Sequence, residues 1–344
     1  MYKNRKRIPG LNVIRTISAL GILQIHFLEL CRQNGYRFAL LETFNSYGNL
    51  SWGLVGTEMF FILSGVSLIY NEYDRDEPSW ASMFYFRRFT RLLPLVYTLH
   101  LIFYFIYAVI DKGWPYHWNF RMVLNMMIGR TYVGEWFTTV ILVCYLLFPL
   151  FRYLIRRSVN CILTTIILAI IFVGDMKLHF LVLDGIKYFS FANGIFGFWT
   201  GMLIGKFLLL HPGILSRRKN RAAVCTLILS GLLTGLMPGI SLLFNPEGPF
   251  YYLPAYLCSV SLFMFLLLIN HSNRFFDSVS DYSFEVYLLH HQIMYLLFPV
   301  FMPLITTQNQ MILFFILMIF IILSSSYSIR SIEKYISGRL SGSL

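Results

Sequence analysis

The segment NVIRTISALGILQIHFLEL, residues 12–30, is an apolar stretch of membrane-spanning length that carries Arg15, His26 and Glu29. Arg15 and His26 are eleven positions apart. At about 100° per residue, an α-helix brings them to within roughly 20° of one face, about 16 Å apart along its axis. Ionisable residues are costly inside a membrane segment and by default mark a functional site. The segment therefore predicts a membrane helix with a functional histidine, His26.

The composition of the whole chain places this helix in a membrane protein. Hydrophobic residues make up 57% of the 344 residues and charged residues only 13%, with a mean hydropathy of +0.64. Nine further apolar segments approach the ~20 residues that a crossing needs. They are residues 51–70, 92–110, 136–154, 159–174, 188–210, 222–240, 252–270, 283–303 and 308–329. The predicted fold is an all-α polytopic bundle of about ten transmembrane helices.

The start of the chain, MYKNRKR followed by an apolar run, superficially resembles a signal peptide. No small-residue cleavage site follows, however, and Arg15 and His26 interrupt the apolar region. We therefore expect a first helix that is retained in the mature protein.

The basic residues predict the orientation of the bundle. With the N-terminus inside, nineteen Lys and Arg residues fall in cytoplasmic segments and seven in outer segments. This bias predicts that both termini are cytoplasmic. Although the net charge is +12, the basic residues are scattered over short loops with no soluble domain behind them, which argues against a nucleic-acid partner.

The chain has no recognisable internal repeat, long linker or appended domain, so residues 1–344 are predicted to form one integral-membrane domain. The five cysteines fall mostly within spans and show no CxxC spacing, so neither a disulfide framework nor a metal site is expected.

The second span contributes a carboxylate, Glu58, about six residues below its outer end. His26 lies at a similar depth in the first span, so the two could form a buried pair in which the carboxylate orients the imidazole of a general base. Glu29, one turn past His26, is the alternative partner. A purely structural interpretation remains: Glu58 as an interfacial helix-entry carboxylate and His26 as a polar packing residue.

Three arginines precede the third span in the stretch YFRRFTRLLPLVY, residues 85–97. On a helical turn, Arg87 or Arg88 shares a face with Arg91, and such a pair forms a two-point clamp suited to phosphates. The alternative is ordinary positive-inside anchoring of a membrane helix.

Several motifs together resemble the acyltransferase-3 family of multi-pass bacterial membrane acyltransferases. They are RTISALGILQIH, GTEMFFILSGVSLIY, FRRFTRLLPLVY, EWFTTVILVCYLLFPLF and SDYSFEVYLLHHQI. The resemblance covers essentially the whole chain and is most specific in the first hundred residues and in residues 280–292. Two positions depart from the family pattern, Val66 in LSGV and Thr138 after WF, and neither is a charged position.

The resemblance implies O-acyl transfer, usually of acetyl, from cytoplasmic acetyl-CoA to a hydroxyl of a cell-surface or lipid-linked glycan, in a bacterial plasma membrane. It implies that His26 is catalytic and that Arg15, Arg88 and Arg91 serve donor binding or site architecture, with Arg87 beside them. The stretches that carry the resemblance also contain further substrate-binding or architectural candidates: Trp136, Tyr145, Ser283, Tyr287 and His290. By their chemistry, Ser64, Ser283 and Tyr287 are candidate oxyanion donors, and the alternative is that they form hydrogen bonds between helices. No permanently bound cofactor is expected.

In the predicted topology, His26 and Glu58 belong to the outer half of the membrane. Arg15, the three arginines before the third span and His290 belong to the cytoplasmic half. One helical step separates His290 from His291, so at most one of them is expected to face the site. Direct transfer with His26 as base and an acyl-histidine intermediate both remain open. A glycan transporter or flippase, or a scaffold of a glycan-assembly complex, remains the alternative to an enzyme.

Overall fold

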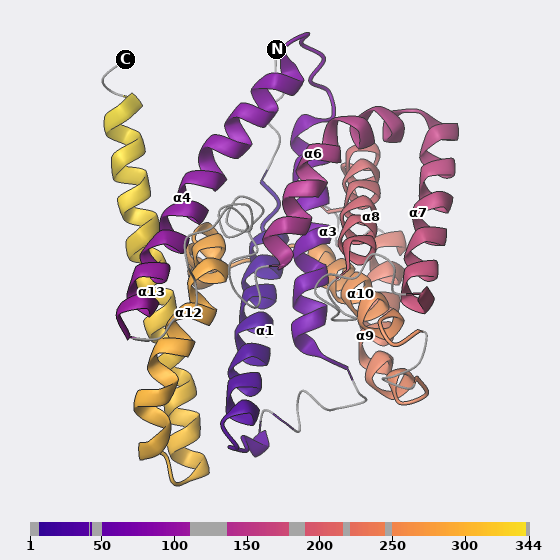
Figure 1. Cartoon of the computed structure of the whole chain (residues 1–344). Coiled ribbons are helices and arrows are strands. Elements are labelled where there is room, and N and C mark those ends of the chain that lie inside the picture. The colour runs from indigo at the N-terminus through magenta and orange to yellow at the C-terminus, as the bar shows by residue number, and fades with distance from the viewer. Residues whose placement is uncertain are drawn as a thin grey trace. The chain divides into compact units, whose positions relative to one another are not determined.

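The computed structural model describes residues 7–40, 42, 50–110, 136–178, 190–215, 221–244 and 250–341, and within these ranges the architecture is all-α. Each of the ten predicted spans coincides with a helix (Figure 1). The elements are α1 (Gly10–Gln33), α3 (Trp52–Glu72), α4 (Trp80–Ile110), α6 (Trp136–Arg156), α7 (Ser158–Leu178), α8 (Phe191–Leu210), α9 (Arg221–Ser241), α10 (Leu253–Ile269), α11 (Arg274–Asp281), α12 (Ser283–Phe301), the 3-10 turn η2 (Met302–Leu304) and α13 (Gln308–Ser341).

Eight of the described helices are long and apolar enough to cross a membrane: α1, α3, α6, α7, α8, α9, α12 together with η2, and α13. The polytopic helical class is thereby confirmed. Helix α10 is apolar but shorter, with 17 residues. The number of ten crossings and the cytoplasmic placement of both termini stay predictions. Several basic residues behind the predicted orientation, among them Lys112, Arg121 and Arg130, lie outside the described residues.

The described chain divides into two compact units, and each is considered by itself. The first unit comprises residues 1–63 and 211–344, and the second comprises residues 64–210. The first part of α3 belongs to the first unit and its last part to the second.

In the first unit, α1 packs against α10, α11 and α12, α12 packs against α13, and α9 packs against α10 (Figure 1). Polar residues set the boundaries between these helices. Asn270 ends α10 in the left-handed conformation, with φ of 46°. The Asn273 side chain accepts a hydrogen bond from the Phe276 backbone N–H at 3.1 Å and so caps the start of α11. The start of the short helix α11, which packs against α1, is therefore fixed by a side-chain cap.

Glycines allow close approach of helices in both units. In the first unit, a Cβ at Gly56 would lie 2.7 Å from the Ser18 carbonyl oxygen of α1. In the second unit, where α6, α7 and α8 pack together, a Cβ at Gly65 would lie 2.0 Å from the Phe198 carbonyl oxygen of α8. Close backbone contact at small residues is the usual packing mode of membrane helices. The glycine of the LSGV motif is thus a packing residue.

Replacing Gly65 by alanine is expected to lower the melting temperature of the purified protein, because backbone atoms of α8 have to move. Gly235 of α9 is the matched control, since no heavy atom lies within 4 Å of a Cβ built there. Gly235→Ala should leave the melting temperature unchanged or raise it slightly, because alanine is the better helix former. Equal melting temperatures for Gly65→Ala and the wild type would contradict the packing role.

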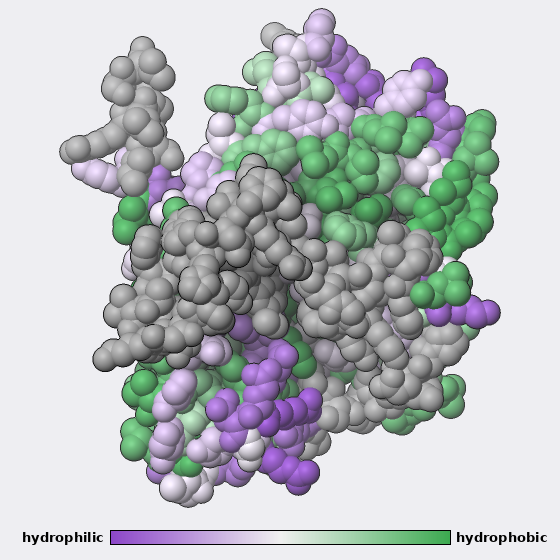
Figure 2. Space-filling view, viewed as in Figure 1, coloured by the Kyte–Doolittle hydropathy of each residue, from purple (hydrophilic) through white to green (hydrophobic). Residues whose placement is uncertain are grey.

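The outer surface of α7 is apolar. Its exposed side chains include Val159, Ile162, Ile167 and Ile170, which are 55–68% exposed. Figure 2 shows hydrophobic side chains along the right-hand edge of the view, where Figure 1 labels α7. A helix with so little of its apolar surface covered by protein fits a lipid environment.

Candidate active site

The centre of the candidate site is His26 of α1, whose side chain is 15% exposed. Its Nδ1 lies 3.1 Å from Oε2 of Glu29, one helical turn further along. An ionised carboxylate can only accept hydrogen bonds, so this contact assigns the ring proton to Nδ1 and leaves a lone pair on Nε2. In enzymes that use a histidine as general base, a carboxylate commonly orients the imidazole in this way.

The predicted pairing of His26 with Glu58 is wrong. Glu58 is fully buried, and its Oε2 accepts a hydrogen bond from the Tyr252 hydroxyl at 2.8 Å. Its Oε1 has no hydrogen-bond partner among the described residues. Similar depth along two helices does not determine how each helix is rotated, and Tyr252, immediately before α10, takes the position opposite the carboxylate. The carboxylate that contacts His26 is Glu29, the alternative considered from the sequence.

Both histidines of α12 lie next to His26, which also corrects the prediction. The ring centre of His26 is 5.1 Å from that of His290 and 5.4 Å from that of His291. Because α1 packs against α12, the His26 ring contacts two consecutive side chains that point to different sides of the helix. The contact places His26 and His290 side by side, whereas the predicted topology had placed them in different halves of the membrane. Their depth in a membrane stays a prediction.

His290 is held in one tautomer. Its side chain is buried, and Nδ1 lies 2.6 Å from the Tyr287 carbonyl oxygen and 3.2 Å from that of Val286. A ring nitrogen this close to a carbonyl oxygen donates, so Nε2 of His290 carries a lone pair. This Nε2 is buried and has no hydrogen-bond partner within the described ranges. The site therefore contains an unsatisfied acceptor next to His26.

The other predicted residues of the first unit lie where α1 meets α11 and α12. Arg15 donates from Nη1 to the Ser280 hydroxyl at 3.2 Å. The Ser283 hydroxyl, at the start of α12, donates to the Ser280 carbonyl oxygen at 3.1 Å. The Tyr287 ring lies 5.7 Å from that of His290. The roles of Arg15, Ser283 and Tyr287 in substrate binding stay predictions.

The predicted arginine clamp belongs to the second unit and lies inside α4, not in a loop before it. Arg87 lies 3.8 Å from Oε2 of Glu72. The guanidinium carbon of Arg88 is 5.9 Å from the ring centre of Phe84 and 5.9 Å from that of Tyr145, and Arg91 is exposed. The structure thus brings two predicted residues, Arg88 and Tyr145, together.

Two further predicted residues lie in the same unit. Ser64 is half-buried in α3, and Trp136 is buried at the start of α6. The roles of Ser64 and Trp136 in substrate binding stay predictions.

Two residues of interest were missed from the sequence. His291 was set aside because it follows His290 directly, and Arg152 was counted only as a cytoplasmic positive charge. Arg152 is only 8% exposed, although it lies near the end of an apolar helix. Its burial reflects long-range contacts that sequence periodicity does not show. Among the residues that the structure describes, no group of three or more His, Cys, Asp or Glu side chains could hold a metal ion.

Comparison with known proteins identifies the class. Residues 8–330 match the family model of an acyltransferase domain, Acyl_transf_3. The chain therefore belongs to this family, as its motifs predicted.

Individual relatives match over a shorter region. A protein of Staphylococcus aureus (strain COL) named "Putative O-acetyltransferase" is 32% identical over 107 residues, which are 29% of this chain and 14% of that protein. The peptidoglycan O-acetyltransferase OatA of Listeria monocytogenes is 24% identical over 112 residues, which are 31% of this chain and 14% of OatA. The matched region is thus a small part of these curated relatives. No solved structure matches the chain.

Proposed function

We propose that the protein is a membrane O-acyltransferase that moves an acetyl group from acetyl-CoA to a hydroxyl of a cell-surface or lipid-linked polysaccharide in a bacterial plasma membrane. Family membership and the eight membrane-length helices support the enzyme class and its environment. The observation that carries the proposal is the contact of His26 with Glu29 beside His290, because it supplies an oriented base within a membrane-length helix.

The proposed reaction uses the free Nε2 of His26. As the acceptor hydroxyl oxygen attacks the thioester carbonyl carbon, Nε2 takes the hydroxyl proton, and the carbonyl becomes a tetrahedral intermediate. The intermediate collapses, the carbon–sulfur bond breaks, and the departing thiolate takes the proton from Nε2. The products are the O-acetyl ester and CoA, and His26 returns to its starting form.

Glu29, the acidic partner of His26, should contribute moderately to the rate of acetyl transfer. Glu29→Gln is expected to lower kcat on the order of tenfold, because the glutamine no longer stabilises the protonated imidazole, and solvent screens a carboxylate that is 46% exposed. The measurement is the initial rate of acetyl transfer at saturating acetyl-CoA. Glu42→Gln, which removes a carboxylate that pairs with Arg32 instead, is the control and should keep the wild-type rate. Equal rates for Glu29→Gln and wild type would exclude Glu29 as the orienting group.

The donor is proposed to enter from the cytoplasm, with Arg88 and Arg91 contacting its phosphates. Arg15 is proposed to serve donor binding or site architecture. Guanidinium groups suit this task because they bind phosphate oxygens in a bidentate manner. Arg91 is exposed and three positions from Arg88, so both can act on one phosphorylated ligand.

Transfer of labelled acetyl tests the proposal. Membranes that contain the wild-type protein should incorporate label from acetyl-CoA into surface glycan, and membranes with His26→Ala at matched expression should not. His271→Ala, which removes an exposed histidine, is the control. Isolation of the labelled sugar would identify the acceptor. A different result would favour a transporter or flippase. The wild type would then transfer no label, although loss of the protein would still alter the surface glycan of the cells.

A further inference from the structure

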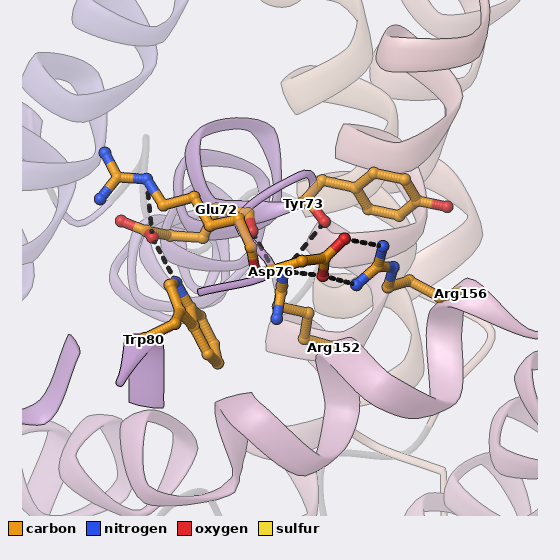
Figure 3. A network of polar contacts seen from close by, with 7 residues as sticks. Glu72, Tyr73, Asp76, Trp80, Arg152 and Arg156 are labelled. Atoms are coloured by element: carbon orange, nitrogen blue, oxygen red, sulfur yellow. Dashed lines mark hydrogen bonds and ion pairs between the residues drawn. The ribbon is translucent and has the colours of Figure 1, made fainter. Parts of the chain in front are cut away.

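The end of α3 is capped by an arginine from another helix. The last carbonyl groups of an α-helix have no partner within the helix. Arg152 of α6 donates from Nε to the Glu72 carbonyl oxygen at 2.8 Å and from Nη2 to that of Tyr73 at 3.2 Å, and it also bonds the carbonyl oxygen of Arg75. Figure 3 shows Arg152 reaching into the turn that follows α3. One side chain therefore holds the carbonyl groups of residues 72, 73 and 75.

The same guanidinium group also holds the start of α4. Its central carbon lies 4.0 Å from the ring centre of Trp80, the first residue of α4, which is cation–π distance. The Trp80 indole N–H donates to Oε2 of Glu72 at 2.8 Å. The end of α3 and the start of α4 are thus joined through Glu72, Trp80 and Arg152 (Figure 3).

The turn between the helices carries a second ionic contact. Asp76 accepts from both terminal nitrogens of Arg156, and Arg152 contacts its Oδ1 at 3.2 Å. The hydrogen bond from Arg156 lowers the pKa of Asp76 to about 2, so this carboxylate is ionised at physiological pH. We call Glu72, Asp76, Trp80, Arg152 and Arg156 the turn clip.

The turn clip continues into the arginine-bearing part of α4. Trp80 stacks on Phe84 with ring centres 5.6 Å apart, and Phe84 packs on Phe148 of α6 at 5.0 Å. One turn further, Arg88 lies against Phe84 and Tyr145, while Arg87 is directed to Glu72. These contacts fix the rotation of α4 about its own axis. They leave Arg88 and Arg91, not Arg87, to act on a ligand.

We propose that Arg152 is a positioning residue for recognition of the phosphorylated part of the acyl donor. Through the turn clip it holds α4 in the rotation that directs both Arg88 and Arg91 to the donor phosphates. Arg87 instead forms an ion pair with Glu72. This inference rests on the proposed function, because it takes acetyl-CoA as the donor.

Two acyl donors distinguish a positioning role of Arg152 from a general effect of Arg152 on protein stability. Acetyl-CoA carries the nucleotide phosphates, whereas acetylpantetheine carries the same thioester without them. The purified full-length protein in proteoliposomes is assayed with each donor, and the ratio of the two kcat/KM values is the readout. Arg152→Lys keeps the charge but loses the planar fork that bonds several carbonyl groups. It is expected to lower the preference for acetyl-CoA about tenfold, because small displacements of binding groups are costly, and to leave kcat/KM for acetylpantetheine unchanged.

Three further variants make the result interpretable. Arg157→Lys, which replaces an exposed arginine directly after the same helix, should keep the wild-type preference. Trp80→Phe removes the hydrogen bond to Glu72 but keeps an aromatic ring, and it should lower the preference in the same direction as Arg152→Lys. If the Arg152→Lys variant does not fold, Trp80→Phe still tests the role of the turn clip. Arg88→Gln should remove most of the preference.

The outcomes distinguish the inference from the function on which it rests. Equal losses with both donors in Arg152→Lys would show a merely structural role and overturn the inference. An unchanged preference in Arg152→Lys and Trp80→Phe, with a lost preference in Arg88→Gln, would overturn the turn clip alone. An unchanged preference in Arg88→Gln would overturn the proposed donor site on α4, and the inference with it.

Discussion

Replacement of His26 by glutamine is expected to lower kcat for acetyl transfer by a factor on the order of 10²–10⁴, the usual contribution of a well-placed general base. Glutamine has a similar polarity and reach but no nitrogen that can take a proton at neutral pH. The KM for acetyl-CoA should stay within about twofold of the wild-type value, because a base that acts only in the transition state adds little to ground-state binding.

The measurement is the rate of labelled acetyl transfer at saturating acetyl-CoA, with protein amounts matched by immunoblot of the membranes. His271→Gln, which replaces an exposed histidine other than the contacting His26, His290 and His291, should retain the wild-type rate. A His26→Gln variant with wild-type kcat would rule out His26 as the base. A variant with normal kcat and a raised KM would instead assign His26 to donor binding.

The architecture was predictable from the sequence because the physical signal is strong. Apolar runs near 20 residues form helices in a membrane whatever their detailed packing, and all ten predicted ranges coincide with helices. The errors lie at helix ends. Helix α4 begins at Trp80, well before the apolar run at residue 92, and α13 extends to Ser341. Polar residues can continue a helix beyond its apolar part, and hydropathy does not detect such extensions.

The candidate site was predictable only in part. His26 was found because an ionisable residue stands out in an apolar segment, and Glu29 was found as a neighbour on the same helix. The choice between Glu29 and Glu58 needed the rotation of α3 relative to α1 and the position of Tyr252, which depend on long-range packing. The turn clip was missed for the same reason, since Arg152 and Glu72 are 80 positions apart in the chain.

The locked tautomer of His290 leads to the second large expected effect. When His26 takes the hydroxyl proton, its Nε2–H becomes a charged donor that a second acceptor can share with the reacting atoms in a three-centre hydrogen bond. Nε2 of His290 is such a buried acceptor, on a ring whose centre lies 5.1 Å from that of His26. A hydrogen bond from a charged donor contributes roughly 1.5–3 kcal/mol, and the low polarity of the surroundings favours it. His290→Phe removes this acceptor and should lower kcat about 10- to 150-fold.

A second substitution at the same position separates hydrogen bonding from packing. The side-chain carbonyl of glutamine can accept the hydrogen bond that Nε2 accepts, so His290→Gln should recover a large part of the kcat lost in His290→Phe. The melting temperatures of the two variants show whether a change in kcat follows a change in stability. Phenylalanine fills a buried space without a polar atom, so His290→Phe should be at least as stable as His290→Gln. Equal loss of kcat in both variants would show that His290 only fills space, whereas recovery by glutamine, despite equal or lower stability, would show that the acceptor lone pair assists the reaction.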